Sequence, residues 1–138
     1  AMIHDIDGVP YKWALLYREP IERWSKGRVT LLGDAAHATL PFLAQGANMA
    51  IEGGYVLARA IASHREDYAA ALRAYETARS ERTARVIRVS AEQASRVHNP
   101  ILLDPAKAEA HVAAEWEKNK VSDRYDWIYA YDALTAAV

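Results

Sequence analysis

The sequence predicts an α+β fold that is mostly α, with a short N-terminal β portion followed by three or four helices. Two long stretches place small and apolar residues at helical spacing, from Gln45 to about Ala62 and from Asp67 towards Val97. Before them, a β-branched stretch at Val29-Thr30 leads to Gly33-Asp34, which is typical of a strand and its exit turn. A chain of 138 residues, 51% of them hydrophobic, is long enough to bury one core.

The composition argues against several classes of partner. Seventeen basic and eighteen acidic residues give a formal net charge of −1, which offers no electrostatic basis for binding nucleic acid or an anionic membrane. The absence of cysteine excludes disulfides, thiolate metal ligands and cysteine nucleophiles. The sequence has no apolar run of about 20 residues and no basic region followed by an apolar core near its start. We therefore expect a soluble, cytoplasmic protein.

The first 26 residues carry the pattern of a small antiparallel sheet. Asp7-Gly8, within Ile3–Pro10, is typical of a hairpin turn. A strand is predicted over Tyr11–Arg18, because Trp13, Leu15 and Tyr17 fall on one of its faces. Packing of Trp13 and Tyr17 in a core is favoured over contact with a ligand.

The stretch from Gly27 to Glu52 combines the features of a ligand site. It predicts a strand, an exit at Gly33-Asp34, a loop held by Pro41 and a small-residue helix that opens at Gln45-Gly46. This order places one carboxylate and one helix N-terminus on the same side of a sheet, where backbone N–H groups can meet a polar or anionic ligand. The alternative is that Asp34 caps only the segment that follows it.

Three segments of this stretch resemble a known family. They are Gly33-Asp34-Ala35-Ala36-His37, Pro41-Phe42-Leu43-Ala44-Gln45-Gly46-Ala47 and Met49-Ala50-Ile51-Glu52. In this order and spacing they resemble the second flavin-binding motif of the FAD-dependent aromatic-ring hydroxylases, which are single-component monooxygenases related to salicylate hydroxylase and the hydroxybenzoate hydroxylases. Segments 13–20, 23–28 and 126–132 are also similar to the salicylate hydroxylase branch, so the resemblance covers most of the chain.

The resemblance implies an FAD site and an activity. Asp34 would accept hydrogen bonds from the ribityl chain, and residues 41–48 would lie beside the isoalloxazine ring, with the helix dipole favouring negative charge on the reduced ring. Gly46 would let the backbone approach that ring without a Cβ in the way. The cofactor-binding residues implied are Gly33, Asp34, Pro41, Gln45, Gly46, Ala47 and Asn48. The parent protein would hydroxylate a small aromatic acid with FAD, O2 and NAD(P)H as co-substrate.

The sequence departs from the family pattern in two ways. Family members commonly carry Asp-Ala after the Ile-Glu pair, whereas Gly53-Gly54 follow Glu52 here, which predicts close helix packing or a kink. The Gly-x-Gly-x-x-Gly turn for the FAD pyrophosphate is absent from the sequence. The resemblance therefore makes residues 1–138 a single C-terminal fragment: the end of a substrate-domain sheet (1–26), a flavin-binding strand-loop-helix (27–62) and a helical C-terminal region (63–138).

The helices are predicted from their spacing and caps. Asp67 can cap the second helix, Asn99-Pro100 ends it, and Asp104-Pro105 starts another that runs through about Asn119. The aromatic segment Tyr125–Tyr131 is costly to expose, so it should pack back on the chain or be buried by a partner. The first helix is expected to bury one close-packed face, made of Ala47, Ala50, Ile51, Gly54, Leu57, Ala58 and Ile61. The apolar positions of the second are Leu72, Tyr75, Val86, Val89 and Val97.

The arginines leave alternatives open. Those of the second helix could face an absent FAD domain or form a solvated face with local ion pairs, and the solvated face is favoured. Arg18 and Arg23 could clamp a substrate carboxylate, but solvated side chains are favoured there too. The second-helix series is Arg73, Arg79, Arg82, Arg85 and Arg88.

Other chemistry has little support in the sequence. The five histidines lack His-Glu-x-x-His spacing, and Asp34 with His37 supplies only two potential ligands, so no metal is predicted. No Gly-x-Ser-x-Gly elbow is present, and no residue stands out as a general base. The alternative function is a non-catalytic helical interaction module, or a truncated remnant that does not bind FAD alone, with exposed apolar surface that favours a homodimer.

Overall fold

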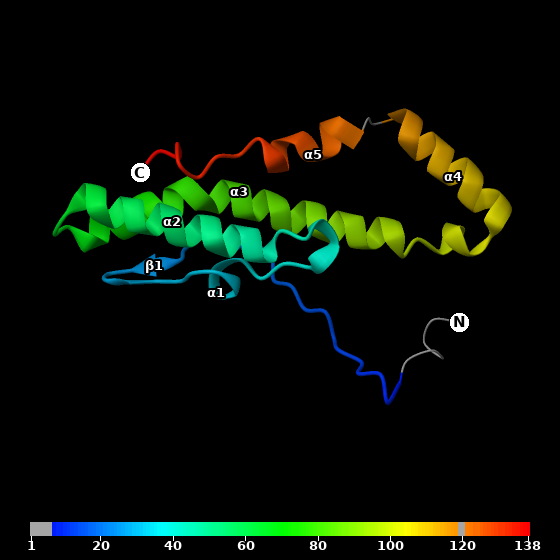
Figure 1. Ribbon diagram of the computed structural model, residues 1–138, viewed down its shortest axis with the longest axis horizontal. Coiled ribbons are helices and arrows are strands. Elements are labelled where there is room, and N and C mark those ends of the chain that lie inside the picture. Colours follow the sequence, from blue (N-terminus) through cyan, green and yellow to red (C-terminus); the bar gives the residue numbers. More distant parts are fainter. Residues whose placement is uncertain (1–6, 119–120) are drawn as a thin grey trace.

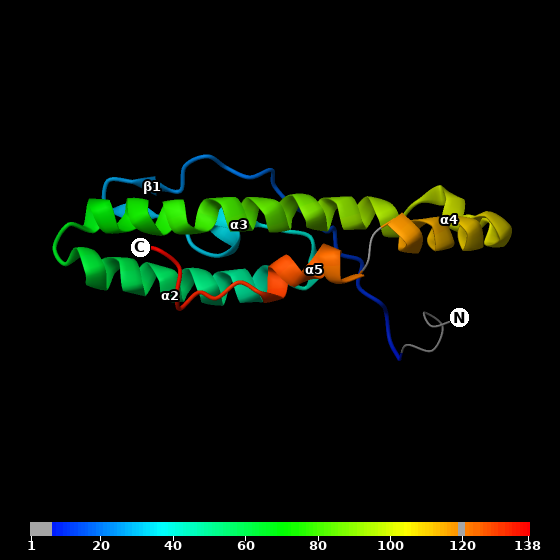
Figure 2. The same cartoon turned by 90° about the horizontal axis from the view of Figure 1, so that it is seen from above.

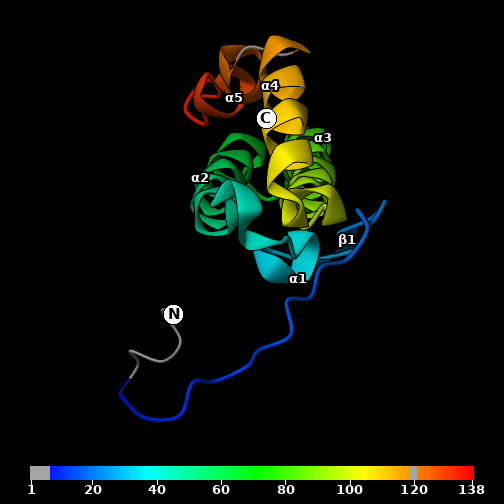
Figure 3. The ribbon, with the colours of Figure 1, turned by 90° about the vertical axis from the view of Figure 1, so that its right-hand side faces the viewer.

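The structure is a computed structural model that describes residues 7–118 and 121–138. Helices α2 (Gly46–His64) and α3 (Tyr68–Val97) run antiparallel, side by side, through the centre (Figures 1 and 2). Seen end-on, a small hairpin and α1 (Asp34–His37) cover one side of this pair, and α5 (Val121–Tyr129) lies on the other (Figure 3). The prediction of a mostly helical α+β fold is confirmed.

The sheet is a short hairpin. Strand β1 (Ser25–Lys26) pairs antiparallel with β2 (Val29–Thr30), with Ser25 opposite Thr30. Gly27 in the turn has a φ of 62°, which favours glycine. After β2 the chain forms α1 and then the 3-10 turn η2 (Pro41–Leu43), so the segment expected to be an irregular loop at Pro41 contains two short helical turns.

The predicted strand at Tyr11–Arg18 is wrong. These residues have no regular secondary structure, and Trp13 and Tyr17 are 82% and 44% exposed instead of lying in a core. A strand needs a neighbour for its backbone N–H and C=O groups, and no strand of the described residues pairs with this one. Figure 3 shows the segment leading away from the helices. Asp7-Gly8 forms a bend, but residues 3–6 of the predicted hairpin lie outside the described residues.

The bounds of α2 agree with the sequence, but its buried face does not. The side chains that α2 buries are those of Met49, Val56 and Ala60, with Gly53 in the same stripe. In the predicted face, Ile51 is 72% and Ile61 37% exposed. Both stripes are small or apolar, so the spacing alone cannot choose between them. Gly53 lies where a Cβ would sit 3.2 Å from Leu32 Cδ1, which confirms close packing there, whereas nothing lies within 4 Å at Gly54.

The ends of the other helices follow the predicted caps. The Asp67 carboxylate accepts a 2.9 Å hydrogen bond from the Ala70 N–H at the start of α3. Asn99 caps a 3-10 turn, η3 (Pro100–Leu103), and Asp104 precedes α4 (Pro105–Lys118) and accepts from the Ala106 N–H at 3.2 Å. In the described part of the chain no helix is both long and apolar enough to span a bilayer.

Two apolar clusters form the core. One contains Trp24, Ala36, Val56, Ala60 and Tyr75, and joins the hairpin side to α2 and α3. The other contains Leu43, Met49, Val86 and Ile128, and joins η2 and the helix pair to α5. Ile128 is 4% exposed, and Tyr125 and Trp127 pack against the same cluster, so the prediction that the segment Tyr125–Tyr131 packs back on the chain is confirmed for these residues. Tyr129 is an exception, since it is 76% exposed. Of the predicted apolar positions on α3, Leu72, Tyr75 and Val86 are buried and Val97 is exposed.

A buried ion-pair cluster, Glu52 with Arg79 and Arg82, links α2 to α3. Arg79 is fully buried, and its Nη2 lies 2.6 Å from Glu52 Oε2. Arg82 donates from Nε to Oε2 at 2.9 Å and from Nη2 to Oε1 at 2.8 Å. Burial alone would raise the pKa of Glu52, but the hydrogen bonds and charges of the two arginines outweigh it and lower the pKa.

Arg82 of this cluster and Arg59 of α2 hold the C-terminal segment, residues 128–138. Arg82 Nη2 also donates to the Ile128 carbonyl at 3.2 Å, and the Tyr131 ring centroid lies 4.0 Å from the Arg82 guanidinium carbon. Arg59 donates from Nη1 to the carbonyls of Ala133 and Ala136 at 3.0 and 2.8 Å. The second-helix arginines were predicted to be solvated and to form local ion pairs. This prediction is wrong for Arg79 and Arg82, because both pair with Glu52 on the neighbouring helix. Arg73 and Arg88 are exposed as expected.

Glu52→Gln tests this cluster. The substitution leaves the Arg79 guanidinium buried without a countercharge, so we expect the free energy of unfolding, measured in urea, to fall by about 3–5 kcal/mol. The pKa of Glu52 is lowered in the folded state. Its stabilisation is therefore full above its ordinary value of 4.5 and is lost as the pH falls through the lowered value, and this acid dependence should be missing from the variant. Glu81→Gln, at an exposed position of α3, is the control, and equal losses in the two variants would contradict the assignment.

Candidate functional site

An open pocket of about 560 Å³ lies between α1, η2 and the N-terminal end of α2. The structure brings Asp34, Pro41, Gly46 and Ala47 of the predicted site together around it. Its remaining lining residues are Thr39, Leu40, Ala44 and Ala50. Most of this wall is backbone and small side chains, so a flat ligand can approach main-chain groups closely.

Asp34 supplies the one carboxylate of the pocket. It is exposed, it begins α1, and among the described residues its carboxylate has no hydrogen-bond partner. The alternative that Asp34 merely caps the next segment therefore has no hydrogen bond to support it. Gly33 precedes it with φ 60° and ψ −140°, a conformation that glycine adopts readily and other residues rarely do. Gly33 itself is buried and is not among the residues that line the pocket.

The N-terminus of α2 supplies unpaired N–H groups. Gln45 is the N-cap residue, and its side chain makes no capping hydrogen bond. The Gln45 amide is buried and donates instead to the Leu43 carbonyl at 3.3 Å, so it braces the turn from inside. The N–H groups of the first helical turn therefore have no side-chain cap, and the positive end of the helix dipole lies beside the pocket. Asn48 is exposed but does not line the pocket.

The turn between Leu40 and Gln45 is held from both ends. Ser90 on α3 donates from Oγ to the Leu40 carbonyl at 2.6 Å in the interior. Ala44 has a φ of 53°, and its N–H donates to the Pro41 carbonyl at 2.9 Å. A left-handed conformation costs a residue with a Cβ about 1–2 kcal/mol. This cost at a pocket residue indicates that the turn is shaped for the pocket.

These residues fit a flavin ring and its ribityl chain. A Cβ added at Gly46 would lie 3.8 Å from Thr39 Cγ2, so the chain itself does not require glycine there and the open space faces the pocket. An acceptor carboxylate suits hydroxyl groups, and a free helix N-terminus suits the electron-rich edge of a reduced ring. Within residues 7–118 and 121–138, no three His, Asp or Glu side chains are grouped as a metal site would require.

Sequence reasoning missed the residues that support the pocket. Thr39, Leu40, Ala44 and Ala50 lie inside or beside the quoted motifs, so a wider reading of the same segments would have found them. Ser90 carries no local signal, because its partner is the carbonyl of a residue fifty positions away. Arg18 and Arg23 are exposed, and Arg18 donates to the Ala35 carbonyl.

Comparison with known proteins agrees with this geometry. A family described as FAD binding domain matches residues 13–90, which is more than half of the chain and includes every pocket residue. The chain belongs to this FAD binding domain family. The resemblance to FAD-dependent aromatic-ring hydroxylases is thereby confirmed, and FAD is the cofactor of the family.

Curated relatives of this FAD binding domain are hydroxylases and monooxygenases. The 3-hydroxybenzoate 6-hydroxylase of Polaromonas naphthalenivorans (strain CJ2) is 37% identical over 88% of this chain and 30% of its own length. The 6-hydroxynicotinate 3-monooxygenase of Bordetella bronchiseptica is 52% identical over 57% of this chain and 21% of its own length. A 3-amino-4-hydroxybenzoate 2-monooxygenase of Streptomyces platensis is 39% identical over 89% and 30%. The chain thus spans less than a third of each of these relatives.

Proposed function

We propose that this chain forms the flavin-ring side of an FAD-dependent monooxygenase that hydroxylates a small aromatic acid with NAD(P)H and O2. The observation that carries the proposal is the pocket that places the free Asp34 carboxylate beside the uncapped N-terminus of α2. The names of the relatives support the substrate class, since they describe action on hydroxybenzoates, a hydroxynicotinate and an aminohydroxybenzoate. The division into residues 1–26, 27–62 and 63–138 is part of the same proposal.

Each predicted residue has a role in this proposal. Asp34 accepts hydrogen bonds from ribityl hydroxyls, and Gly33 allows the turn that presents it. The backbone of residues 41–48 borders the ring, and the N–H groups and dipole of α2 stabilise its reduced, anionic form. Gln45 fixes the turn instead of touching the ring. FAD supplies the redox chemistry when bound, while the chain supplies orientation and polarity.

Titration with flavin tests the role of Asp34. We expect the purified chain to quench flavin fluorescence saturably, with riboflavin binding about as well as FAD because the chain lacks a Gly-x-Gly-x-x-Gly turn for the pyrophosphate. Asp34→Asn should raise the dissociation constants of FAD and of riboflavin about tenfold or more, as expected for the loss of a charge-assisted hydrogen bond.

Asp67→Asn is the matched control for this titration, since asparagine also caps helices well and Asp67 lies outside the pocket. Saturable binding that is equal in the two variants would contradict the role of Asp34. The complete absence of flavin binding would contradict the site and favour a non-catalytic interaction module.

Gly46→Ala tests the close approach of the backbone. The new methyl group meets only Thr39 Cγ2 within the chain, at 3.8 Å, so thermal stability should be kept while flavin affinity falls about tenfold. Gly54→Ala on the same helix is the control, because nothing lies within 4 Å of its added methyl group. Helix propensity predicts that it raises stability by up to about 1 kcal/mol without changing affinity. Unchanged affinity in Gly46→Ala would place the ring elsewhere.

The exposed apolar stripe of α2 is the surface on which we propose that the chain forms a homodimer. Ile51 is 72% and Tyr55 45% exposed, and the two lie one turn apart on the same face of α2. Light scattering should show a dimer that Ile51→Glu converts to a monomer. Leu103→Glu changes an apolar residue of η3 that is 86% exposed and lies outside α2, and it should leave the mass unchanged. A monodisperse wild-type monomer would argue against this surface.

A further inference from the structure

His37 is a buried polar residue that the proposed flavin chemistry does not use. Its side chain is 1% exposed, and its ring centroid lies 5.8 Å from that of Trp24, which in turn packs 5.6 Å from Tyr75. Neither ring nitrogen has a hydrogen-bond partner among the described residues. A buried polar group without a partner destabilises the folded state, so its presence calls for an explanation.

The surroundings of His37 accept a neutral ring and oppose a charged one. Burial lowers the pKa of His37 below its ordinary value of 6.5. The His37 backbone carbonyl opposes this shift without reaching hydrogen-bond geometry. Arg79 on α3 acts with burial, whereas the carboxylates of Asp34 on α1 and Glu52 on α2 favour the charged form. Glu52 is already engaged with two arginines, so it offers no hydrogen bond to an imidazolium here.

His37 is coupled to Asp34 through a single helical turn. The two residues are the last and first of the four-residue α1. The N–H groups of Ala36 and His37 both donate to the Gly33 carbonyl at 2.9 Å, which ties the turn to the glycine that presents Asp34. Ala36 and His37 are the side chains that α1 buries, and an alanine alone offers little apolar surface. The His37 ring is therefore the main anchor of α1.

We propose that His37 is a positioning residue of the flavin site, which seats α1 and Asp34 only as a neutral imidazole, so that acid releases the flavin. As the pH falls, His37 takes up a proton, and the new N–H group has no hydrogen-bond acceptor among the described residues. The ring then leaves its place beside Trp24. The movement of the ring carries Asp34 away from the pocket. This inference rests on the proposed function, and its test separates the two.

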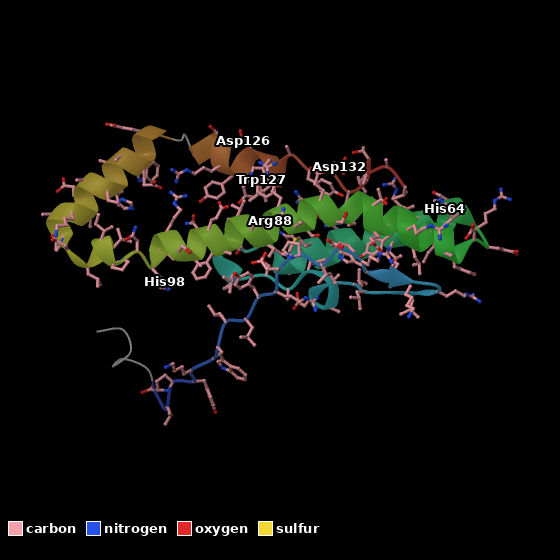
Figure 4. All side chains as sticks on the ribbon, turned by 180° about the vertical axis from the view of Figure 1, so that it is seen from behind. His64, Arg88, His98, Asp126, Trp127 and Asp132 are labelled. Atoms are coloured by element: carbon pink, nitrogen blue, oxygen red, sulfur yellow. The ribbon has the colours of Figure 1, made fainter. Side chains whose placement is uncertain are left out.

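Flavin affinity as a function of pH is the first measurement. One linked proton changes affinity by at most tenfold per pH unit, so we expect the FAD dissociation constant of the wild-type chain to rise roughly tenfold between about pH 7.5 and pH 5. His37→Phe fills the same space without titrating, so the ratio of its dissociation constants at the two pH values should stay near one. His64→Phe is the control, because His64 lies at the far end of α2 (Figure 4) and should keep the wild-type ratio. A ratio that is the same in wild type and His37→Phe overturns the proposal.

Nuclear magnetic resonance of the wild-type chain is the second measurement, and it needs neither flavin nor a variant. The imidazole nitrogens of His37 should show a neutral ring at about pH 6.5 and become charged only at lower pH. The amide signals of residues 34–37 should change in step with that charge. A charged His37 with unchanged α1 amides overturns the proposal, whereas failure of the chain to bind flavin at about pH 7.5 counts against the proposed function alone.

Discussion

The carboxylate of Glu52 fixes how the two central helices meet. A guanidinium group at the centre of a small protein is stable only when an opposite charge reaches it, and Arg79 has one such partner in Glu52. This requirement selects the stripe of α2 that faces α3, and with it the position of the N-terminus of α2 relative to η2. Arg79 also donates to the Met49 carbonyl at 3.4 Å, close to the start of α2. The geometry of the pocket therefore depends on the Glu52–Arg79 ion pair, although neither residue lines the pocket.

The pocket presents main chain where many binding sites present side chains. Two buried residues hold its turn from the interior. Ser90 donates a hydrogen bond to the Leu40 carbonyl, and Gln45 donates one to the Leu43 carbonyl. With these carbonyls paired inside, the small residues Ala44, Gly46 and Ala47 can leave the outer surface open. Asp34 is then the one charged residue that lines the pocket. In the proposed function, its carboxylate therefore determines most of the chemical selectivity of the pocket.

The sequence predicted best what short-range chemistry decides. The caps at Asp67 and at Asp104-Pro105 located helix starts within a residue, because the carboxylates bond to N–H groups two or three positions away. The strand at Tyr11–Arg18 failed because pairing requires a second strand, which local alternation cannot supply.

Features that depend on distant residues were harder to predict. The face of α2 could not be chosen from its spacing, since it has apolar residues on more than one side, and the choice is made by a charge on α3. The placement of Asp34, Pro41, Gly46 and Ala47 around one pocket could be anticipated, because they belong to one continuous segment. The hydrogen bond from Ser90 that holds this segment could not be anticipated, because Ser90 lies fifty residues further along the chain.

The attachment of the C-terminal segment has a consequence for how this protein can vary. Arg59 and Arg82 hold the segment by its carbonyl oxygens at Ile128, Ala133 and Ala136, and every amino acid supplies a carbonyl. The side chains of Ile128, Tyr131, Ala133, Ala136 and Val138 are constrained because they pack against the core or stack on an arginine. At the other positions of this segment, substitutions can therefore be tolerated while its path stays the same. Related chains should accumulate substitutions there without shifting the backbone, as long as the two arginines are retained.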